Sequence, residues 1–150
     1  MSEVDAVEIL IVEDTPQDLE LTLRALRKAN LTNRIHVARD GVEALEFIFC
    51  EGAYSARKID NRPKVILLDL KLPKVDGIEV LRRVKGDPRT KDIPVVVLTS
   101  SKEQKDVVDS YELGVNSYIV KPVNFERFTS AVQDMGMYWL LLNQPPKMDG

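Results

Sequence analysis

The sequence is poor in the residues that build disulfides, histidine-based metal sites and membrane spans. Its 150 residues contain one cysteine, Cys50, and one histidine, His36. A single cysteine excludes an internal disulfide and agrees with a reducing compartment. No apolar run approaches the roughly 20 residues of a membrane span, and the acidic start MSEVDAVEIL lacks the basic flank of a secretory signal. We therefore expect a cytoplasmic protein without a membrane partner.

An excess of positive charge is also missing. The chain has 21 Lys and Arg against 24 Asp and Glu, a net charge of −3, and its basic residues are dispersed. Binding to nucleic acid depends on clustered positive charge, so we expect no nucleic-acid partner. The length suits one domain. We expect this domain to span residues 1–150, with its core at about 8–134 and a C-terminal helical extension at 135–150.

What the sequence does contain is a regular alternation of two patterns. Short apolar runs rich in β-branched residues occur at Glu8–Val12, Arg34–Ala38, Lys64–Asp69, Pro94–Thr99 and Ser117–Val120. The runs EILIV, KVILLD and PVVVLT are almost continuously apolar, which is typical of strands covered on both faces. Helical patterns follow the strands and begin at Thr15-Pro16, Asp40-Gly41, Asp76-Gly77, Ser101 and Asn124. Gln104 is placed to complete a capping box with Ser101.

This order of β-then-α units predicts an α/β fold of the doubly wound class. We expect a flavodoxin-like (βα)5 three-layer sandwich with a parallel sheet in the order 2-1-3-4-5. One long polar connection, Gly52–Pro63, interrupts the alternation, and we expect a mobile loop or a short helical extension there. In doubly wound folds, ligands bind beyond the carboxyl ends of the strands. The residues after each predicted strand are therefore the first candidates for a functional site.

Four strand ends carry polar residues that suit phosphoryl transfer: Glu13-Asp14, Asp69, Thr99 and Lys121. Carboxylates crowded at one sheet edge repel one another unless a cation joins them, and Mg²⁺ prefers such oxygen ligands. One carboxylate can attack phosphorus, while the metal, an ammonium and a neutral hydroxyl bind the other phosphoryl oxygens. Asp14 alone could be a turn residue or a helix cap, and Lys121 alone a surface lysine, whereas a lone buried carboxylate at Asp69 would be costly. The four positions together favour a site.

These residues lie in the segments ILIVEDTPQD, VILLDLKLPKVDG, VVVLTSS and SYIVKPVN. From about residue 8 to residue 134, this set of motifs resembles the CheY-like receiver domains of bacterial response regulators. The resemblance implies that Asp69 accepts a phosphoryl group. It also implies a Mg²⁺ ion, which Mn²⁺ can replace, bound directly by Asp14 and Asp69, through water by Glu13, and by the backbone carbonyl of Lys71.

The same resemblance implies a signalling switch. Thr99 and Lys121 would contact the phosphoryl group, and Tyr118 would rotate together with a movement of Thr99. The Lys121-Pro122 bond would be cis. Lys71 departs from many receivers, which carry a smaller or acidic-amide residue there, and its long cation would affect the lifetime of the phosphorylated state. The protein would catalyse only its own phosphorylation and dephosphorylation, and it would signal without an attached output domain.

Two further segments, GAYSARKIDNRP and DMGMYWLLLNQPP, resemble the small response regulators of cyanobacterial phytochromes, which are light-sensing histidine kinases. This resemblance implies a phytochrome-type histidine kinase as the partner. The tail segment Met135–Leu142 is apolar around most of its circumference, so it needs a surface to cover it. We expect a homodimer through the fourth helix, fifth strand, fifth helix and tail. Docking of the kinase or another target is the alternative.

Three rival functions stay open on the sequence alone. A phosphatase of the haloacid-dehalogenase type would use a nucleophile in an Asp-x-Asp pattern after the first strand, where this chain has Glu13-Asp14-Thr15. A flavodoxin-type flavin carrier would need a Ser/Thr/Gly-rich phosphate loop in place of EDTPQD. A pseudo-receiver, which is an interaction module only, usually lacks acceptor or metal residues, and this chain keeps them.

Overall fold

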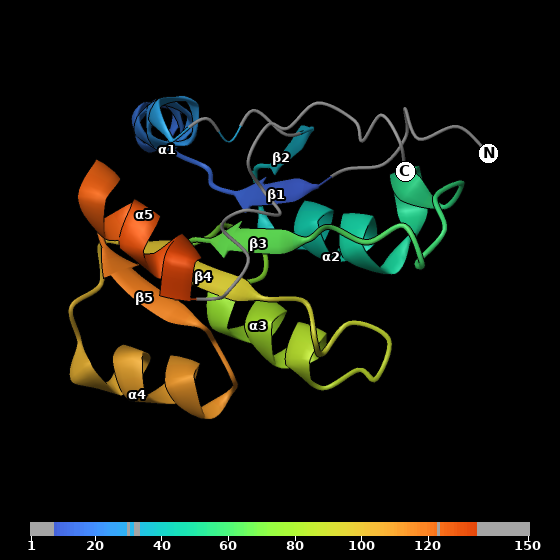
Figure 1. The fold of residues 1–150 in the computed structure, drawn as a ribbon. Helices are drawn as coiled ribbons and strands as arrows, with labels where there is room; N and C mark the ends of the chain where they lie inside the picture. Colours follow the sequence, from blue (N-terminus) through green and yellow to red (C-terminus); the bar gives the residue numbers. More distant parts are fainter. Residues whose placement is uncertain (1–7, 30, 32–33, 123, 135–150) are drawn as a thin grey trace.

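The computed structural model describes residues 8–29, 31, 34–122 and 124–134. Strands and helices alternate along it (Figure 1). In order, they are β1 (Ile9–Val12), α1 (Pro16–Lys28), β2 (Ile35–Ala38), α2 (Gly41–Phe49), η2 (Gly52–Tyr54), β3 (Val65–Leu68), α3 (Gly77–Lys85), β4 (Val95–Thr99), α4 (Gln104–Glu112), β5 (Ser117–Val120) and α5 (Phe125–Asp134). The predicted strands and helices are confirmed, with shifts at their ends. The predicted extension at 135–150 lies outside the described residues, and no described helix is long and apolar enough to cross a membrane.

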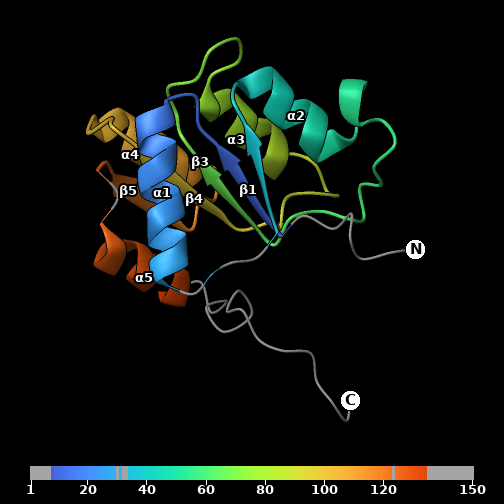
Figure 2. The same cartoon turned by 90° about the horizontal axis from the view of Figure 1, so that it is seen from above.

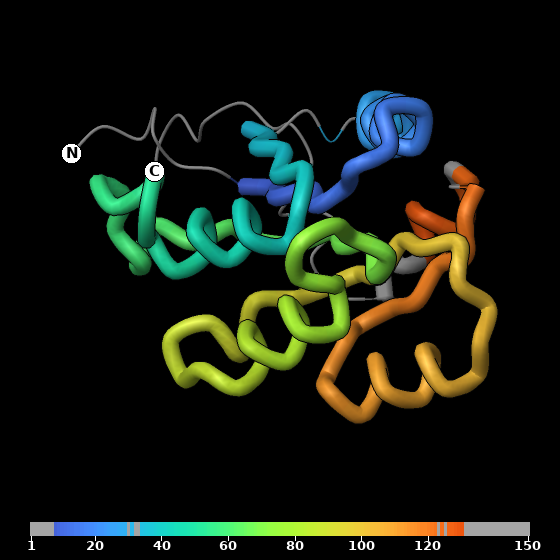
Figure 3. The backbone as a smooth tube through the Cα atoms, turned by 180° about the vertical axis from the view of Figure 1, so that it is seen from behind, coloured from blue at the N-terminus to red at the C-terminus, as the bar shows by residue number. Residues whose placement is uncertain are grey.

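The strands form one parallel sheet in the order β2-β1-β3-β4-β5, as predicted. Helices α1 and α5 lie on one face of the sheet, while α2, α3 and α4 lie on the other (Figure 1 and Figure 2). The same layers are visible from behind (Figure 3). The strand order reverses at β1, so β1 and β3 flank the switch point at which doubly wound folds bind their ligands.

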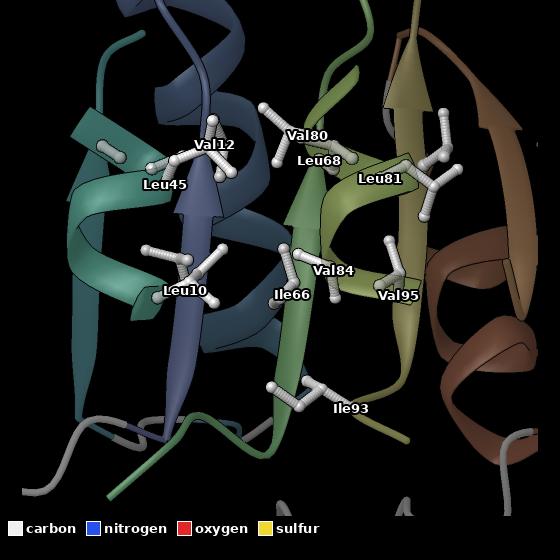
Figure 4. Close-up of a cluster of buried hydrophobic side chains, with 14 of the residues drawn as sticks. Leu10, Val12, Leu45, Ile66, Leu68, Val80, Leu81, Val84, Ile93 and Val95 are labelled. Atoms are coloured by element: carbon white, nitrogen blue, oxygen red, sulfur yellow. The ribbon is translucent and has the colours of Figure 1, made fainter. Parts of the chain in front are cut away.

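Alternate residues of the central strands pack on opposite faces of the sheet. The side chains that pack with α2 and α3 include Leu10, Val12, Ile66, Leu68 and Val95 (Figure 4). Those in the cluster with α1 and α5 include Ile9, Ile11, Val65, Leu67 and Val96. Because both faces are covered, β1, β3 and β4 are buried along their whole length, which explains their continuous apolar patterns. These buried strands hold the residues that follow them in fixed positions.

The helix starts agree with the prediction for α1, α2, α3 and α5, to within one residue, and disagree for α4. The side chains of Asp40 and Asp76 cap α2 and α3 by accepting the backbone N–H three residues further on. The predicted capping box is wrong, because α4 begins at Gln104 and makes no side-chain cap hydrogen bond. The Ser101 hydroxyl instead donates to the Asp106 carboxylate, in the first turn of α4. The Ser101 oxygen accepts the Glu103 N–H at 3.3 Å rather than the Gln104 N–H that a capping box would use, because α4 begins three residues after Ser101.

The segment Gly52–Pro63 contains the short 3₁₀ helix η2, which confirms the expected helical extension. Arg57 anchors the segment, because its guanidinium lies 3.7 Å from the centre of the Phe47 ring and donates to the Phe47 carbonyl. The Tyr54 hydroxyl donates to Glu43 at 2.8 Å and lies 3.1 Å from His36 Nε2. The His36 ring stacks on Phe47 with 4.2 Å between ring centres. The single histidine thus has a structural role.

Candidate functional site

The carboxyl ends of β1 and β3 bring three carboxylates together. Val12 and Leu68 are partners in the parallel register, and the Asp69 N–H donates to the Val12 carbonyl at 3.1 Å. Glu13 and Asp14 follow β1, and Asp69 follows β3. The three side chains each place one oxygen within 4.8 Å of the others. Glu13 and Asp69 are buried, with 3% and 5% of their surface exposed, whereas Asp14 is more accessible.

The ammonium group of Lys121 lies within this carboxylate cluster. Lys121 follows β5, and its backbone N–H donates to the Thr99 carbonyl at 2.8 Å. Its Nζ lies 2.8 Å from Glu13 Oε1, 2.9 Å from Asp69 Oδ2 and 2.8 Å from Asp18 Oδ2. An ammonium has three hydrogens, so each carboxylate can accept one of them. The Lys121 side chain is only 7% exposed, and a buried charge is tolerated when it has such partners. The predicted cis bond to Pro122 is present.

The charges of this cluster influence one another strongly. Burial raises the pKa of Glu13 to about 7; the charge of Asp69 adds to this rise, and hydrogen bonding to Lys121 opposes it. For Lys121, burial by itself lowers the pKa, but the hydrogen bonds to Asp18, Glu13 and Asp69 together outweigh burial and raise it. Lys121 therefore stays protonated. Burial and repulsion by Asp69 favour the protonated form of Glu13. A second cation would relieve this repulsion.

The donor set fits a hard divalent cation. Glu13, Asp14 and Asp69 offer carboxylate oxygens alone, which Mg²⁺ and Mn²⁺ prefer. Two of these carboxylates are held in place by backbone groups. The Thr15 N–H donates to Glu13 Oε2 at 3.2 Å, and the Lys71 N–H donates to Asp69 Oδ1 at 3.1 Å. The three predicted carboxylate ligands are thus brought together, while the metal-binding roles of these side chains and of the Lys71 carbonyl stay predictions.

A groove opens beside the carboxylates. It has a volume of about 360 Å³ and is lined by Asp14, Leu70, Lys71, Leu72, Pro73, Asp76, Ile78 and Asp106. Lys71 reaches across it, with its Nζ 3.9 Å from Asp106 Oδ2 and 60% of its side chain exposed. The long cation that distinguishes this chain therefore pairs with a carboxylate of α4.

The two predicted switch residues meet at one loop. Thr99 ends β4 and is fully buried, and its Oγ1 accepts the Ser101 N–H at 3.4 Å. Tyr118 lies on the neighbouring strand β5, and its hydroxyl donates to the Ser101 carbonyl at 3.0 Å. Ser101 thus contacts both side chains, so a shift of the β4–α4 loop would affect them together.

Two carboxylates of the site were missed by sequence reasoning. Asp18 lies in the first turn of α1, and Asp106 lies in the first turn of α4. Acidic residues are common in first turns because they interact favourably with the helix dipole, so no local signal marked these two. The structure shows that Asp18 binds Lys121 and that Asp106 binds Ser101. The contact of Asp18 with Lys121 joins residues that are 103 positions apart, whereas Asp106 and Ser101 are only five positions apart.

Comparison with known proteins identifies relatives over most of the chain. Response regulator Rcp1 of Synechocystis is 42% identical over 132 residues, which are 88% of this chain and 88% of Rcp1. The Mn²⁺-bound crystal structure of Rcp1 covers 94% of this chain and 99% of its own, at 40% identity and a TM-score of 0.75. The bacteriophytochrome response regulator RtBRR is 54% identical, with a TM-score of 0.83, over 94% of this chain and 84% of its own. The phosphorylated cyanobacterial phytochrome response regulator RcpA is 41% identical, with a TM-score of 0.74, over 90% and 94% of the two chains.

A family match agrees with these relatives. The profile described as the response regulator receiver domain matches residues 9–133. Proteins of this family are signalling proteins. The match decides against the phosphatase and the flavin carrier, and it agrees with the observed strand order and strand-end residues. The chain therefore belongs to the family of response regulator receiver domains.

Proposed function

We propose that this protein accepts a phosphoryl group on Asp69 from a phosphohistidine of a histidine kinase. The observation that carries the proposal is the position of the Asp69 carboxylate, which is buried beside Glu13 and Asp14 and 2.9 Å from the Lys121 ammonium. A buried carboxylate at this sheet edge, with a fixed cation next to it, is arranged for in-line attack on phosphorus. The whole chain, 1–150, would act as a single receiver in the cytoplasm.

The chemistry proceeds in one displacement. An oxygen of the Asp69 carboxylate forms a bond to phosphorus, while the bond from phosphorus to the imidazole nitrogen of the donor breaks. The imidazole keeps the electron pair and takes up a proton from solvent. The Lys121 ammonium and the Thr99 hydroxyl then donate hydrogen bonds to the phosphoryl oxygens. Water later attacks phosphorus, breaks its bond to the Asp69 oxygen and releases inorganic phosphate, which restores the carboxylate. These two reactions are the only ones that the protein catalyses.

A divalent ion completes the site. Asp14, Glu13 and Asp69, with the backbone carbonyl of Lys71, would hold Mg²⁺, and Mn²⁺ can substitute for it. When bound, the ion neutralises charge on the carboxylates and on the incoming phosphoryl oxygens. The choice is supported by the all-oxygen donor set, and by the description of the Rcp1 structure as Mn²⁺-bound.

The signal leaves the site through Thr99 and Tyr118. A hydrogen bond from the Thr99 hydroxyl to the phosphoryl group draws the β4–α4 loop toward Asp69. The Tyr118 hydroxyl then loses its hydrogen bond to the Ser101 carbonyl, and the side chain takes a new orientation. This rotation changes the surface formed by α4, β5 and α5. The present contacts of Ser101 with both side chains support this route.

The partners follow from the relatives and from one exposed surface. RtBRR and RcpA are described as phytochrome response regulators, which supports a light-sensing histidine kinase as the phosphodonor.

Val108 and Tyr111 of α4 are 43% and 50% exposed. A groove of about 310 Å³ next to them is lined by Tyr111, Ser117, Tyr118, Ile119, Glu126, Arg127 and Ser130. We assign this surface to a homodimer, because two-fold pairing is the usual arrangement of identical subunits. The tail, which we also expect in the dimer interface, lies outside the described residues.

The test of the proposed function is phosphoryl transfer followed by intact-mass measurement. The purified chain is incubated with Mg²⁺ and a small phosphodonor, and separately with a panel of autophosphorylated histidine kinases that includes a bacteriophytochrome. We expect one added phosphoryl group on the wild type and on Asp92→Asn, whose carboxylate is exposed and pairs with Arg62, and none on Asp69→Asn. Labelling of Asp69→Asn would refute the acceptor assignment. No labelling of any protein would indicate a pseudo-receiver.

A further inference from the structure

Among the described residues, three carboxylates bind Lys121. Two of them belong to the cluster of Glu13, Asp14 and Asp69, and the third, Asp18, lies outside it. The Lys121 ammonium contacts Glu13, Asp69 and Asp18 at nearly equal distances of 2.8, 2.9 and 2.8 Å. Glu13 and Asp69 are cluster members, whereas Asp18 projects from the first turn of α1. Its side chain is 30% exposed, so it reaches the buried ammonium from the rim of the site.

The three contacts differ in what phosphoryl transfer does to them. An oxygen of Asp69 becomes bonded to phosphorus, so the contact between Lys121 and the Asp69 carboxylate has to be replaced. Glu13 is needed by the divalent ion. Asp18 takes part in neither event, so its hydrogen bond can persist through the whole reaction. One N–H of the ammonium then stays attached to α1, while the others can turn toward phosphoryl oxygens.

We propose that Asp18 is a positioning residue, which holds the Lys121 ammonium beside Asp69 while the phosphoryl group arrives. The inference rests on the proposed function and adds α1 to the elements that build the site. A lysine side chain has four rotatable carbon bonds, and a fixed partner reduces the freedom that has to be lost when the transition state forms. A carboxylate suits this purpose because its bond to an ammonium is charge-assisted.

Two simpler roles for Asp18 lead to different results. If Asp18 were only a favourable charge at the start of α1, its removal would lower stability slightly and leave the phosphorylation rate unchanged. If Asp18 acted only as one more negative charge near the site, its removal would speed the reaction with an anionic phosphodonor. The positioning role alone predicts that removal slows the chemical step.

The experiment measures phosphorylation rates at saturating Mg²⁺ over a range of concentrations of a small phosphodonor. We expect Asp18→Ala to lower the maximal rate by about tenfold, and Asp18→Asn to lower it less because the amide oxygen still accepts a hydrogen bond. Glu20→Ala removes the same charge from an exposed position of α1 and should keep the wild-type rate. In a Lys121→Met background, Asp18→Ala should cause no further loss, because the two residues act as one unit.

A second readout needs neither metal nor phosphodonor. In the metal-free protein, the Lys121 ammonium should give a resolved NH₃⁺ signal in ¹H–¹⁵N NMR, and Asp18→Ala should broaden or abolish it. An unchanged or raised rate in Asp18→Ala, or additive losses with Lys121→Met, would overturn the proposal. A wild type that takes up no phosphoryl group would refute the proposed function instead, and the NMR signal would then decide the contact by itself.

Discussion

Gly77 provides a direct test of how tightly the fold constrains the acceptor loop. It is the first residue of α3, and its N–H donates to the Leu70 carbonyl at 2.9 Å. A Cβ atom at this position would lie 2.3 Å from the Asp69 carbonyl oxygen and 2.5 Å from Leu70 Cα. These separations are about 1 Å shorter than ordinary van der Waals contacts. Both neighbouring atoms belong to the backbone, so no side-chain rotation can make room.

The size of the effect follows from this overlap. In Gly77→Ala, either α3 or the backbone of Asp69 has to move. Overpacking of this kind costs about 1–3 kcal/mol. The lower entropy of the unfolded alanine chain recovers part of it, about 0.4–1 kcal/mol where the backbone is unstrained. We therefore expect a net loss of about 1–2 kcal/mol, which for a chain of this length lowers Tm by about 2–8 °C. A shift of Asp69 by about 1 Å would also slow phosphorylation by about 100-fold.

The assay compares Gly77→Ala with a matched glycine variant at the other end of α3. Gly86→Ala is suitable because Gly86 has a φ of −90° and its added Cβ would meet only the Arg82 carbonyl oxygen, at 3.0 Å. Thermal unfolding followed by circular dichroism and phosphorylation rates are measured for both. Gly86→Ala should stay within about 1 kcal/mol of the wild type. If Gly77→Ala were as stable and as active as this control, the reasoning about the acceptor loop would be refuted.

Three further predictions test separate parts of the molecule. Chelation should abolish phosphorylation, and calorimetry should show that Asp14→Ala weakens Mg²⁺ binding more than Glu13→Ala does; full labelling in excess chelator would contradict the metal site. Burial lowers the pKa of His36 below its ordinary value of 6.5 despite the nearby Glu43, so the unfolded chain binds a proton at a higher pH than the folded one. The free energy of unfolding should then fall as pH decreases below about 6.5, less so in His36→Gln, and the single histidine signal in an NMR titration should have a midpoint below 6.5. Sedimentation should show a dimer at micromolar concentration that Tyr111→Ala weakens, whereas a single 17.0 kDa species for both proteins would exclude the homodimer.

Much of the fold was predictable because its signals are local. Strands covered on both faces have continuous apolar sequences, and aspartates such as Asp40 and Asp76 mark helix starts by binding backbone groups three residues away. The predicted capping box at Ser101 failed because α4 begins at Gln104, so Ser101 lies two residues before the N-cap position, Glu103. Local patterns predict the existence of a helix better than its exact first residue.

The alternation of strands and helices, the doubly wound class of the fold and the polar residues at the strand ends were predictable from the sequence. These follow from periodicity and from the rule that parallel strands end at the same edge of a sheet. The set of carboxylates that shares the Lys121 ammonium is visible only in the folded structure. Asp18 and Lys121 are 103 positions apart, and their contact depends on how α1 packs on the sheet. Distances of this kind are set by the packing of whole elements, which no single segment of the sequence determines.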